Sequence, residues 1–173
     1  MTHEPDVLYV AIDDDRVHIS MGGGSWHLPV GPVALYDTEL RSSDPPDPVD
    51  LTNALAAVRD HLDDVIRDEP AVVTARSVVA TGPHAIGLAR VEIGLAALPG
   101  GYELGRDDAE EVFRTLVAEP SADRRFNPGL PSSQTDSIIG TCCVILAIMR
   151  RLDLARMEIP ADAIGPIEAA AEG

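Results

Sequence analysis

Three consecutive carboxylates, Asp13, Asp14 and Asp15, are the residues whose type and spacing most directly suggest chemistry. Carboxylate oxygens are ligands that hard divalent cations prefer, but three successive residues cannot all converge on one ion without a second segment. Aspartate is also frequent in tight turns, because its short side chain hydrogen-bonds the nearby backbone. A weak metal site and a solvated hairpin turn are the two alternatives, and we expect the turn.

The histidines and cysteines show no ligand pattern along the chain. The five histidines lie at positions 3, 18, 27, 61 and 84 and lack the spacing of a zinc site, so we expect none. His18 and His27 fall on adjacent predicted strands, where they could meet. Cys142 and Cys143, the only two cysteines, are neighbours in an apolar run and cannot bridge each other, which predicts buried thiols in a reducing compartment.

Two glycine-containing segments could meet an anion. Thr81 and Gly82 precede a predicted helix, and His84 in its first turn could recognise a phosphate or nucleotide. The alternative for His84 is a polar first-turn residue in solvent. The run 22–24 has no helix after it, so we interpret it as a flexible turn.

Composition limits the class of protein. With 173 residues, 45% of them hydrophobic, the chain is the size of one domain with a full core. Aromatic residues are only 3%, so Val, Leu, Ile and Ala must fill the interior, as in a helix-covered sheet. The 13 basic residues, all arginines, face 29 acids, for a net charge of -16. Such a field repels nucleic acid, polyphosphate and anionic lipid.

The ends and the apolar runs bear on location. The first ten residues contain neither a basic segment nor an apolar segment of the kind found in signal peptides. The longest apolar run, 142–149, is far too short to span a membrane. We therefore expect a cytoplasmic protein that binds no membrane.

Hydrophobic periodicity predicts an α/β domain. An antiparallel three-stranded meander is expected at 7–12, 16–21 and 25–35, the last strand bent at Pro29 and Pro32. Further strands are expected at 77–80, 102–104 and 156–159. Helices are expected at 51–67, 84–98, 106–118 and 164–171, with the longest, central and buried one at 134–152.

This order of elements resembles the ribonuclease-H-like lobe used twice in actin, hexokinase and Hsp70-type ATPases. The segment WHLPVGPVAL (26–35) is similar to S-L-P-L-G-A-V-R-L of the exopolyphosphatase/guanosine pentaphosphate phosphatase (Ppx/GppA) family. In the right order follow DPPDPVDL (44–51), SVVATGPHAIGLA (77–89) and NPGLPSSQTDSIIG (127–140), which resemble D-P-P-T-x-x-E-L, V-G-x-G-G-T-A-T-x-L-A and P-G-L-P-x-x-R-A-D-x-I-x-x-G. The resemblance covers nearly the whole chain and implies the second lobe of that family, with helices on both faces of the sheet.

The chain departs from the family where phosphate is bound. By spacing, Asp13, Asp14, Asp15 and Arg16 replace the D-I-G-G-G-S turn, whose glycines let backbone N–H groups approach a phosphate. A rival alignment places the run 21–25 on that motif. The second family turn keeps one glycine, but the proline after it removes an N–H donor. The terminal S-x-x-G-L-R motif has lost its arginine, and the resemblance begins after the family's preceding lobe, which carries its other phosphate loop and catalytic glutamate.

These departures predict a catalytically degenerate single lobe over 1–173, with the meander in 1–41 and the helix-linked remainder in 42–173. We expect a pseudoenzyme without cofactor that acts as a protein-interaction or regulatory module. Its partner would be a second copy or another protein, held at the face that a first lobe would cover. The alternatives are a phosphatase subunit for polyphosphate or (p)ppGpp that needs a separate first lobe and Mg²⁺ at the aspartates, and a nucleotide sensor at Thr81, Gly82 and His84.

Overall fold

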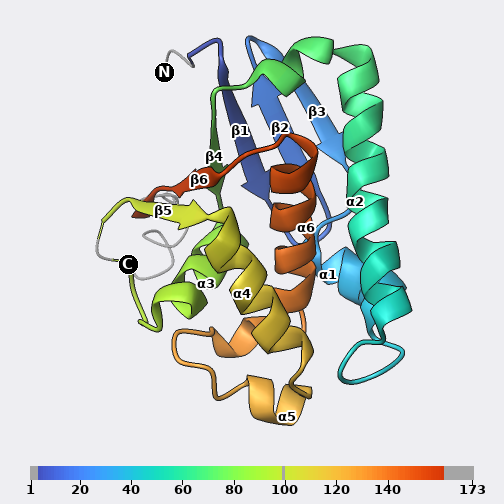
Figure 1. The fold of residues 1–173 in the computed structure, drawn as a ribbon, viewed down its shortest axis with the longest axis vertical. Helices are drawn as coiled ribbons and strands as arrows, with labels where there is room; N and C mark the ends of the chain where they lie inside the picture. The colour runs from blue at the N-terminus through green and yellow to red at the C-terminus, as the bar shows by residue number, and fades with distance from the viewer. Residues whose placement is uncertain (1–3, 99, 162–173) are drawn as a thin grey trace, which may run out of the picture.

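The computed structural model describes residues 4–98 and 100–161. Six strands form one sheet in the order β3-β2-β1-β4-β6-β5 (Figure 1). Their bounds are β1 Val7–Ile12, β2 Val17–Met21, β3 Gly24–Leu28, β4 Ser77–Thr81, β5 Tyr102–Gly105 and β6 Arg156–Ile159. β1, β4 and β6 are parallel, and the other neighbours pair antiparallel. The predicted mixed α/β class, with an opening meander followed by helix-linked strands, is confirmed.

Helices and helical turns connect the strands. They are α1 Pro32–Leu35, α2 Pro48–Asp68, α3 Pro83–Ile93, α4 Arg106–Val117, α5 Ser121–Arg124 and α6 Ile138–Arg151. A π-helical segment, Tyr36–Leu40, extends α1, and 3₁₀ turns occupy Pro70–Thr74 and Ser132–Gln134. The helix expected at 164–171 lies outside the described residues.

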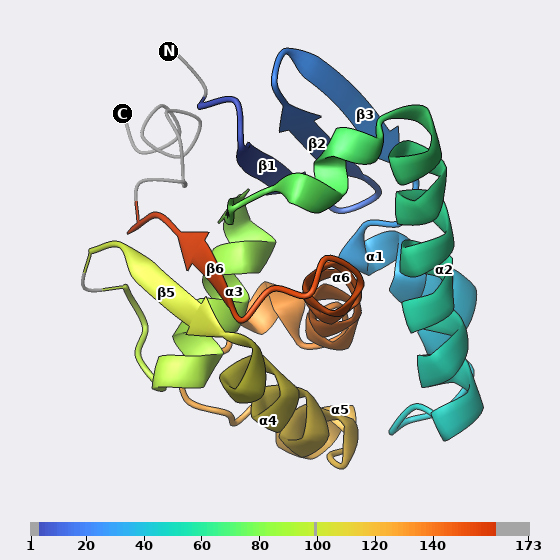
Figure 2. The same cartoon turned by 45° about the horizontal axis from the view of Figure 1, so that its top comes forward.

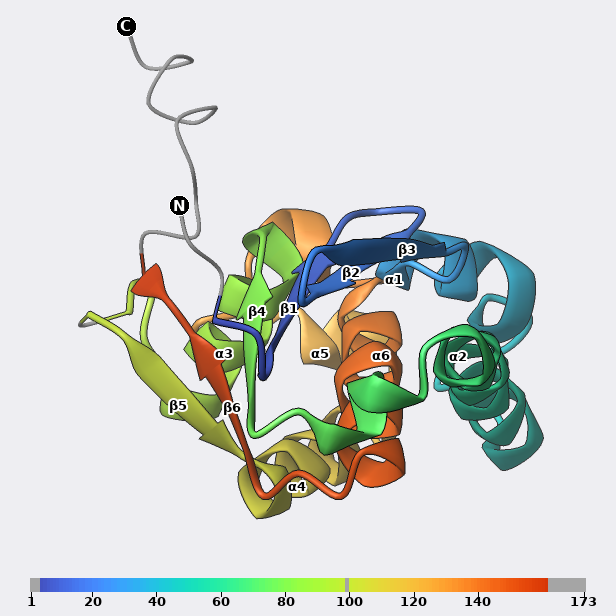
Figure 3. The same ribbon diagram turned by 90° about the horizontal axis from the view of Figure 1, so that it is seen from above.

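Alternation along the central strands separates the two faces of the sheet. In β1, Leu8, Val10 and Ile12 are fully buried, whereas Tyr9 and Ala11 between them are half-buried. The buried face is covered by helices, and Figure 3 shows α2 and α6 along this side. The period of two thus separates core positions from half-buried ones in β1, although its sequence is apolar throughout.

Helix α6 is the centre of the core. Every residue of it from Ile138 to Met149 is buried, and it packs against α1, α2, α3 and α4 (Figure 2). The prediction of a central buried helix is confirmed, but two details were wrong. The helix begins at Ile138, because the residues expected to start it form the 3₁₀ turn, and the 21-residue α2 is longer.

Two other predicted bounds were also wrong. The third strand ends at Leu28, because Pro32 begins α1 at a position where proline's missing N–H and fixed φ suit a helix start. The helix expected to reach 98 ends at Ile93, because Gly94 adopts a left-handed conformation, φ 70°, and caps it. Within 4–98 and 100–161, no helix has the length and apolar character needed to cross a bilayer.

Candidate functional site

The two turns singled out from the sequence meet at one end of the sheet. β1 and β4 are parallel neighbours with Ala11 opposite Thr81, so their carboxyl ends lie together beside the start of α3 (Figure 1). Asp13–Arg16 follows β1 and Gly82 follows β4. Ligands of open α/β sheets usually bind at the carboxyl ends of parallel strands. This edge is therefore the candidate site.

The aspartate turn is held by backbone contacts. The Asp13 N–H donates to the Arg16 carbonyl at 3.0 Å, which closes the hairpin. The Val33 and Ala34 N–H groups donate to the Asp14 carbonyl at 2.9 and 3.2 Å, so the first turn of α1 is satisfied by the hairpin itself. The chain passes so close that a Cβ on Gly31 would overlap the backbone of the turn.

A carboxylate–imidazole pair joins the two turns. Nε2 of His84 lies 2.6 Å from Oδ1 of Asp14. The His84 side chain is 6% exposed, whereas that of Asp14 is 72% exposed, so the pair reaches from the core to the surface. The expectation of a solvated His84 was wrong, because the histidine is buried beneath the turn.

The orientation of His84 limits its chemistry. An imidazole that directs Nε2 at a carboxylate leaves Nδ1 for proton transfer. Here Nδ1 is buried and makes no hydrogen bond within the described part of the chain. A general base must reach the proton it removes, and this nitrogen faces the interior instead of solvent. The pair therefore ties α3 to the hairpin and presents only the Asp14 carboxylate outward.

Gly82 and Pro83 shape the other side of the site. Gly82 has φ 104° and ψ 166°, a conformation nearly exclusive to glycine, and a Cβ there would lie 2.8 Å from the Ile12 carbonyl oxygen. Pro83 begins α3 and contributes no N–H. Its carbonyl accepts a hydrogen bond from Nε2 of Gln134 at 3.0 Å. Gln134 had no assigned role in the sequence interpretation; its position in the family-like P-G-L-P-x-x-R motif was the available signal.

The electrostatics of the site disfavour anions. Ile12, Pro83, His84 and the turn 13–16 line an open hollow of about 310 Å³. Asp13, Asp14, Asp15 and Arg16 are all exposed, which gives three carboxylates against one guanidinium. Among residues 4–98 and 100–161, no three His, Cys, Asp or Glu side chains converge as a metal site.

The rival alignment places its glycine turn at the wrong end of the sheet. Gly22 and Gly23 have φ 57° and 88° and join β2 to β3. Because β2 runs antiparallel to β1, this turn lies at the amino end of β1, where a Cβ on Gly22 would be 3.7 Å from the Pro5 carbonyl oxygen. The aspartate turn is the one that adjoins β4 and α3.

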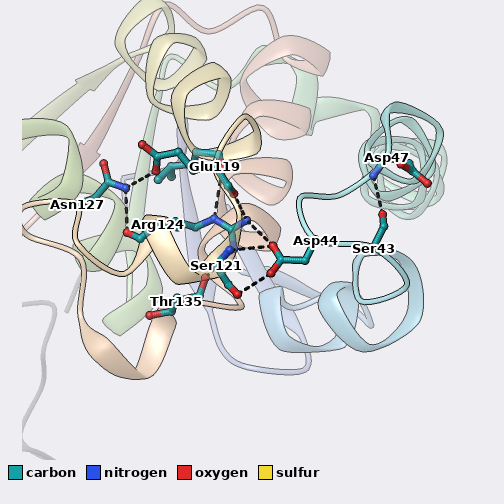
Figure 4. A network of polar contacts seen from close by, with 9 residues as sticks. Ser43, Asp44, Asp47, Glu119, Ser121, Arg124, Asn127 and Thr135 are labelled. Atoms are coloured by element: carbon teal, nitrogen blue, oxygen red, sulfur yellow. Dashed lines mark hydrogen bonds and ion pairs between the residues drawn. The ribbon is translucent and has the colours of Figure 1, made fainter.

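A second polar cluster surrounds Arg124, which is 3% exposed (Figure 4). Its guanidinium donates to the carbonyls of Leu116, Glu119 and Thr135 at 3.3, 2.7 and 3.1 Å. It also lies 3.7 Å from Asp44, which accepts hydrogen bonds from the Ser121 amide and hydroxyl. The Ser121 hydroxyl, the Ser121 amide and the Arg124 charge lower the pKa of Asp44. Because the guanidinium is used internally, this cluster is structural.

No protein-family profile and no curated protein sequence matches the chain. Its fold superposes on an exopolyphosphatase-like protein with a TM-score of 0.80 and 18% identity, covering 96% of this chain and 60% of the other. An Aquifex aeolicus Ppx/GppA phosphatase superposes with a TM-score of 0.78 and 17% identity, covering 94% of this chain and 56% of the other. An exopolyphosphatase from Cytophaga hutchinsonii superposes with a TM-score of 0.70 and 19% identity, covering 90% of this chain and 53% of the other.

The chain spans between 53% and 60% of the length of these three structures. Identities near 18% establish shape, while the nature of the site must come from its own residues. The aspartate hairpin, the parallel β1–β4 pair and the helices around α6 together have the fold of a single actin-like lobe of the kind seen in Ppx/GppA structures.

Proposed function

We propose that this chain is a catalytically degenerate Ppx/GppA-like lobe that acts as a protein-interaction module. The observation that carries the proposal is how the aspartate hairpin is used. The Asp14 carbonyl accepts hydrogen bonds from two amides of α1, and the Asp14 carboxylate pairs with His84. The charged side chains of Asp13 and Asp15 are exposed to solvent. A phosphoryl group at this edge would meet three exposed carboxylates, and Pro83 removes one N–H donor from the start of α3.

The same edge of the sheet is the proposed contact surface. The solved relatives continue for a further 40% or more of their length beyond the match, whereas the hairpin here is exposed. A second copy of the chain or a different protein would cover it. Exposed carboxylates at its centre favour a basic patch on the partner, because complementary charge fixes orientation and speeds encounter.

Light scattering coupled to size-exclusion chromatography, together with pull-down, tests the interaction. The expected result is a dimer or a defined complex that Asp13→Arg with Asp15→Arg disrupts. The matched control is Glu69→Arg with Asp68→Arg, which reverses two charges at the end of α2. A strict monomer without an interacting protein, or equal disruption by both pairs, would overturn the proposal.

A phosphatase or nucleotide-binding subunit that depends on a separate first lobe is the second candidate. Its support is the meeting of Thr81, Gly82 and His84 with Asp13–Arg16 at the carboxyl ends of β1 and β4. Calorimetry with tripolyphosphate, ATP, GTP and pppGpp, and phosphate release with Mg²⁺, distinguish the two. If the chain releases phosphate, and Asp14→Ala abolishes this turnover while Asp68→Ala leaves it intact, the chain is an enzyme subunit and the interaction-module proposal is wrong.

A further inference from the structure

The β2–β3 hairpin carries a pair of imidazoles that the proposed function does not use. His18 and His27 lie directly opposite each other in the antiparallel register. Their ring centroids are 4.4 Å apart, and the contact is exposed. Nδ1 of His18 lies 3.2 Å from Nδ1 and 3.3 Å from Nε2 of His27. The pair therefore presents ring nitrogens to a common point that solvent can reach.

These separations match those of two ligands on one ion. A tetrahedral zinc ion with Zn–N bonds of about 2.0–2.1 Å places neighbouring nitrogens roughly 3.3–3.4 Å apart. A hydrogen bond between imidazoles instead directs one N–H at one lone pair. Nδ1 of His18 is nearly equidistant from both nitrogens of His27, and the rings are tilted by 58°. The N···N separations thus already match those of two ligands on one ion, and rotation of the rings about their side-chain bonds would direct the lone pairs.

The surroundings leave room for the ion and its water. Ala11 of β1 lies opposite His18 on its other side, and the next pair on the same face of the hairpin is Ser20 with Ser25. Alternate residues of a strand share a face, so small side chains flank the imidazoles on that side, while the exposed Arg16 precedes His18 on the same face. The net charge of -16 also raises the local concentration of divalent cations.

We propose that His18 and His27 form a two-imidazole site for a zinc-class divalent cation, with water completing the coordination. Borderline cations of this class favour neutral imidazole over the carboxylate ligands that Mg²⁺ takes. The sequence already placed His18 and His27 on adjacent strands, and no zinc site was expected because it placed no further protein ligand nearby. Within the described residues no third ligand joins the pair, and in the proposed site water takes the remaining positions. The pair lies on β2 and β3, with His18 two positions beyond Arg16 at the end of the aspartate turn.

Zinc titration of the full chain by calorimetry at pH 7.5 tests the site. All variants carry His3→Ala, because that imidazole lies outside the described residues and could contribute binding of its own. One ion per chain is expected, and His18→Ala or His27→Ala should weaken binding at least about tenfold, because each leaves a single ligand. His61→Ala, which removes an imidazole from α2, is the matched control and should leave affinity unchanged.

Nuclear magnetic resonance supplies a second readout that does not depend on stability. Zinc should shift the ring Cε1–H resonances of His18 and His27 before those of His61 and His84. The proposal is overturned by equal zinc affinity in the His18→Ala/His27→Ala double variant. It is also overturned if His61→Ala weakens binding as much as either substitution in the pair, or if the earliest resonance shifts occur at another histidine.

Discussion

At the scale of single residues, Gly82 shows how backbone conformation determines the site. Substitution by alanine combines an unfavourable φ with a Cβ 2.8 Å from the Ile12 carbonyl oxygen. We expect Gly82→Ala to reduce the free energy of unfolding by about 1–3 kcal/mol, measured by urea denaturation. Gly100→Ala is the control for conformation alone, because Gly100 has φ 116° with nothing within 4 Å of an added Cβ. Equal losses in both variants would mean that the close approach to Ile12 contributes nothing.

The buried His84 makes a second prediction at this scale. Asp14→Ala removes the partner of a nearly fully buried imidazole, and the expected cost is about 1 kcal/mol, because water can partly replace the exposed carboxylate. Asp14→Asn retains an acceptor and should cost less. Asp15→Ala, at the exposed neighbour, should change stability by less than about 0.5 kcal/mol. Denaturation midpoints of the three variants check this order, and an Asp15→Ala loss equal to that of Asp14→Ala would contradict it.

The partners in this pair explain which part of the site was predictable. Asp13–Arg16 and Thr81–His84 were each recognisable from turn chemistry and family-like spacing. Their hydrogen bond joins residues 70 positions apart, and nothing local to either segment encodes it. The inward orientation of His84 Nδ1 depends on how α3 packs, so the sequence could place the residue at the start of a helix but could not show that its side chain is buried.

At the scale of elements, Arg124 links α5 by hydrogen bonds and an ion pair to the elements around it. It joins the end of α4 and the turn before α6, and its ion pair reaches the loop that precedes α2 (Figure 4). Arg124→Ala leaves three carbonyls without their donor and should cost about 3 kcal/mol or more in thermal or urea unfolding. Arg125→Ala is the matched control, since Arg125 lies over the exposed Phe126 ring and should cost under about 1 kcal/mol. Similar losses of stability in the two variants would show that the Arg124 hydrogen bonds do not stabilise this region.

Asp44 gives the same cluster a dependence on pH. Its pKa is lowered mainly by the hydrogen bond from the Ser121 hydroxyl; burial opposes this as the second-largest effect, and the Ser121 amide and the Arg124 charge lower the pKa further. A lowered pKa in the folded state contributes stability above the ordinary value of 3.8, and this contribution is lost as pH falls toward the folded-state pKa. Asp44→Asn should therefore flatten the acid decline of the urea midpoint below that value. Asp47→Asn, in the same loop, should retain the decline; an unchanged slope in Asp44→Asn would contradict the assignment.

Element bounds were predictable where a local signal dominates. The strands 7–12 and 156–159 were predicted with the bounds that the structure has, because each is a short segment with a strand-like apolar pattern, continuous in 7–12, between polar or turn residues. Pro32 and Gly94 also carried the right local signals, a helix start and a helix end, but the apolar runs beside them were given more weight. The start of α6 could not be predicted from a local signal. The 3₁₀ turn before it includes Gln134, whose side chain donates a hydrogen bond to the carbonyl of Pro83 in a distant segment.

At the scale of the whole molecule, charge opposes the compact state. With 29 acids and 13 basic residues, sixteen carboxylates remain even if every arginine pairs once. Surface pairs such as Arg67–Asp64 and Arg114–Glu111 stabilise little, so their screening by salt should cost less than the repulsion that salt relieves. We expect the melting temperature to rise as NaCl increases from about 0.01 to about 0.1 M, where the screening length falls from about 30 to about 10 Å.

Differential scanning calorimetry measures this rise, with sucrose as a control that stabilises without screening. Asp13→Asn with Asp15→Asn should raise the melting temperature at low salt and lose most of that advantage at high salt, because the removed repulsion is already screened there. A melting temperature that falls with added NaCl would show instead that the ion pairs outweigh the excess of carboxylates. Repulsion between the aspartates of the exposed hairpin would then not limit stability. Charge reversal at the hairpin would in that case lower the melting temperature of the chain as well as weaken any complex it forms.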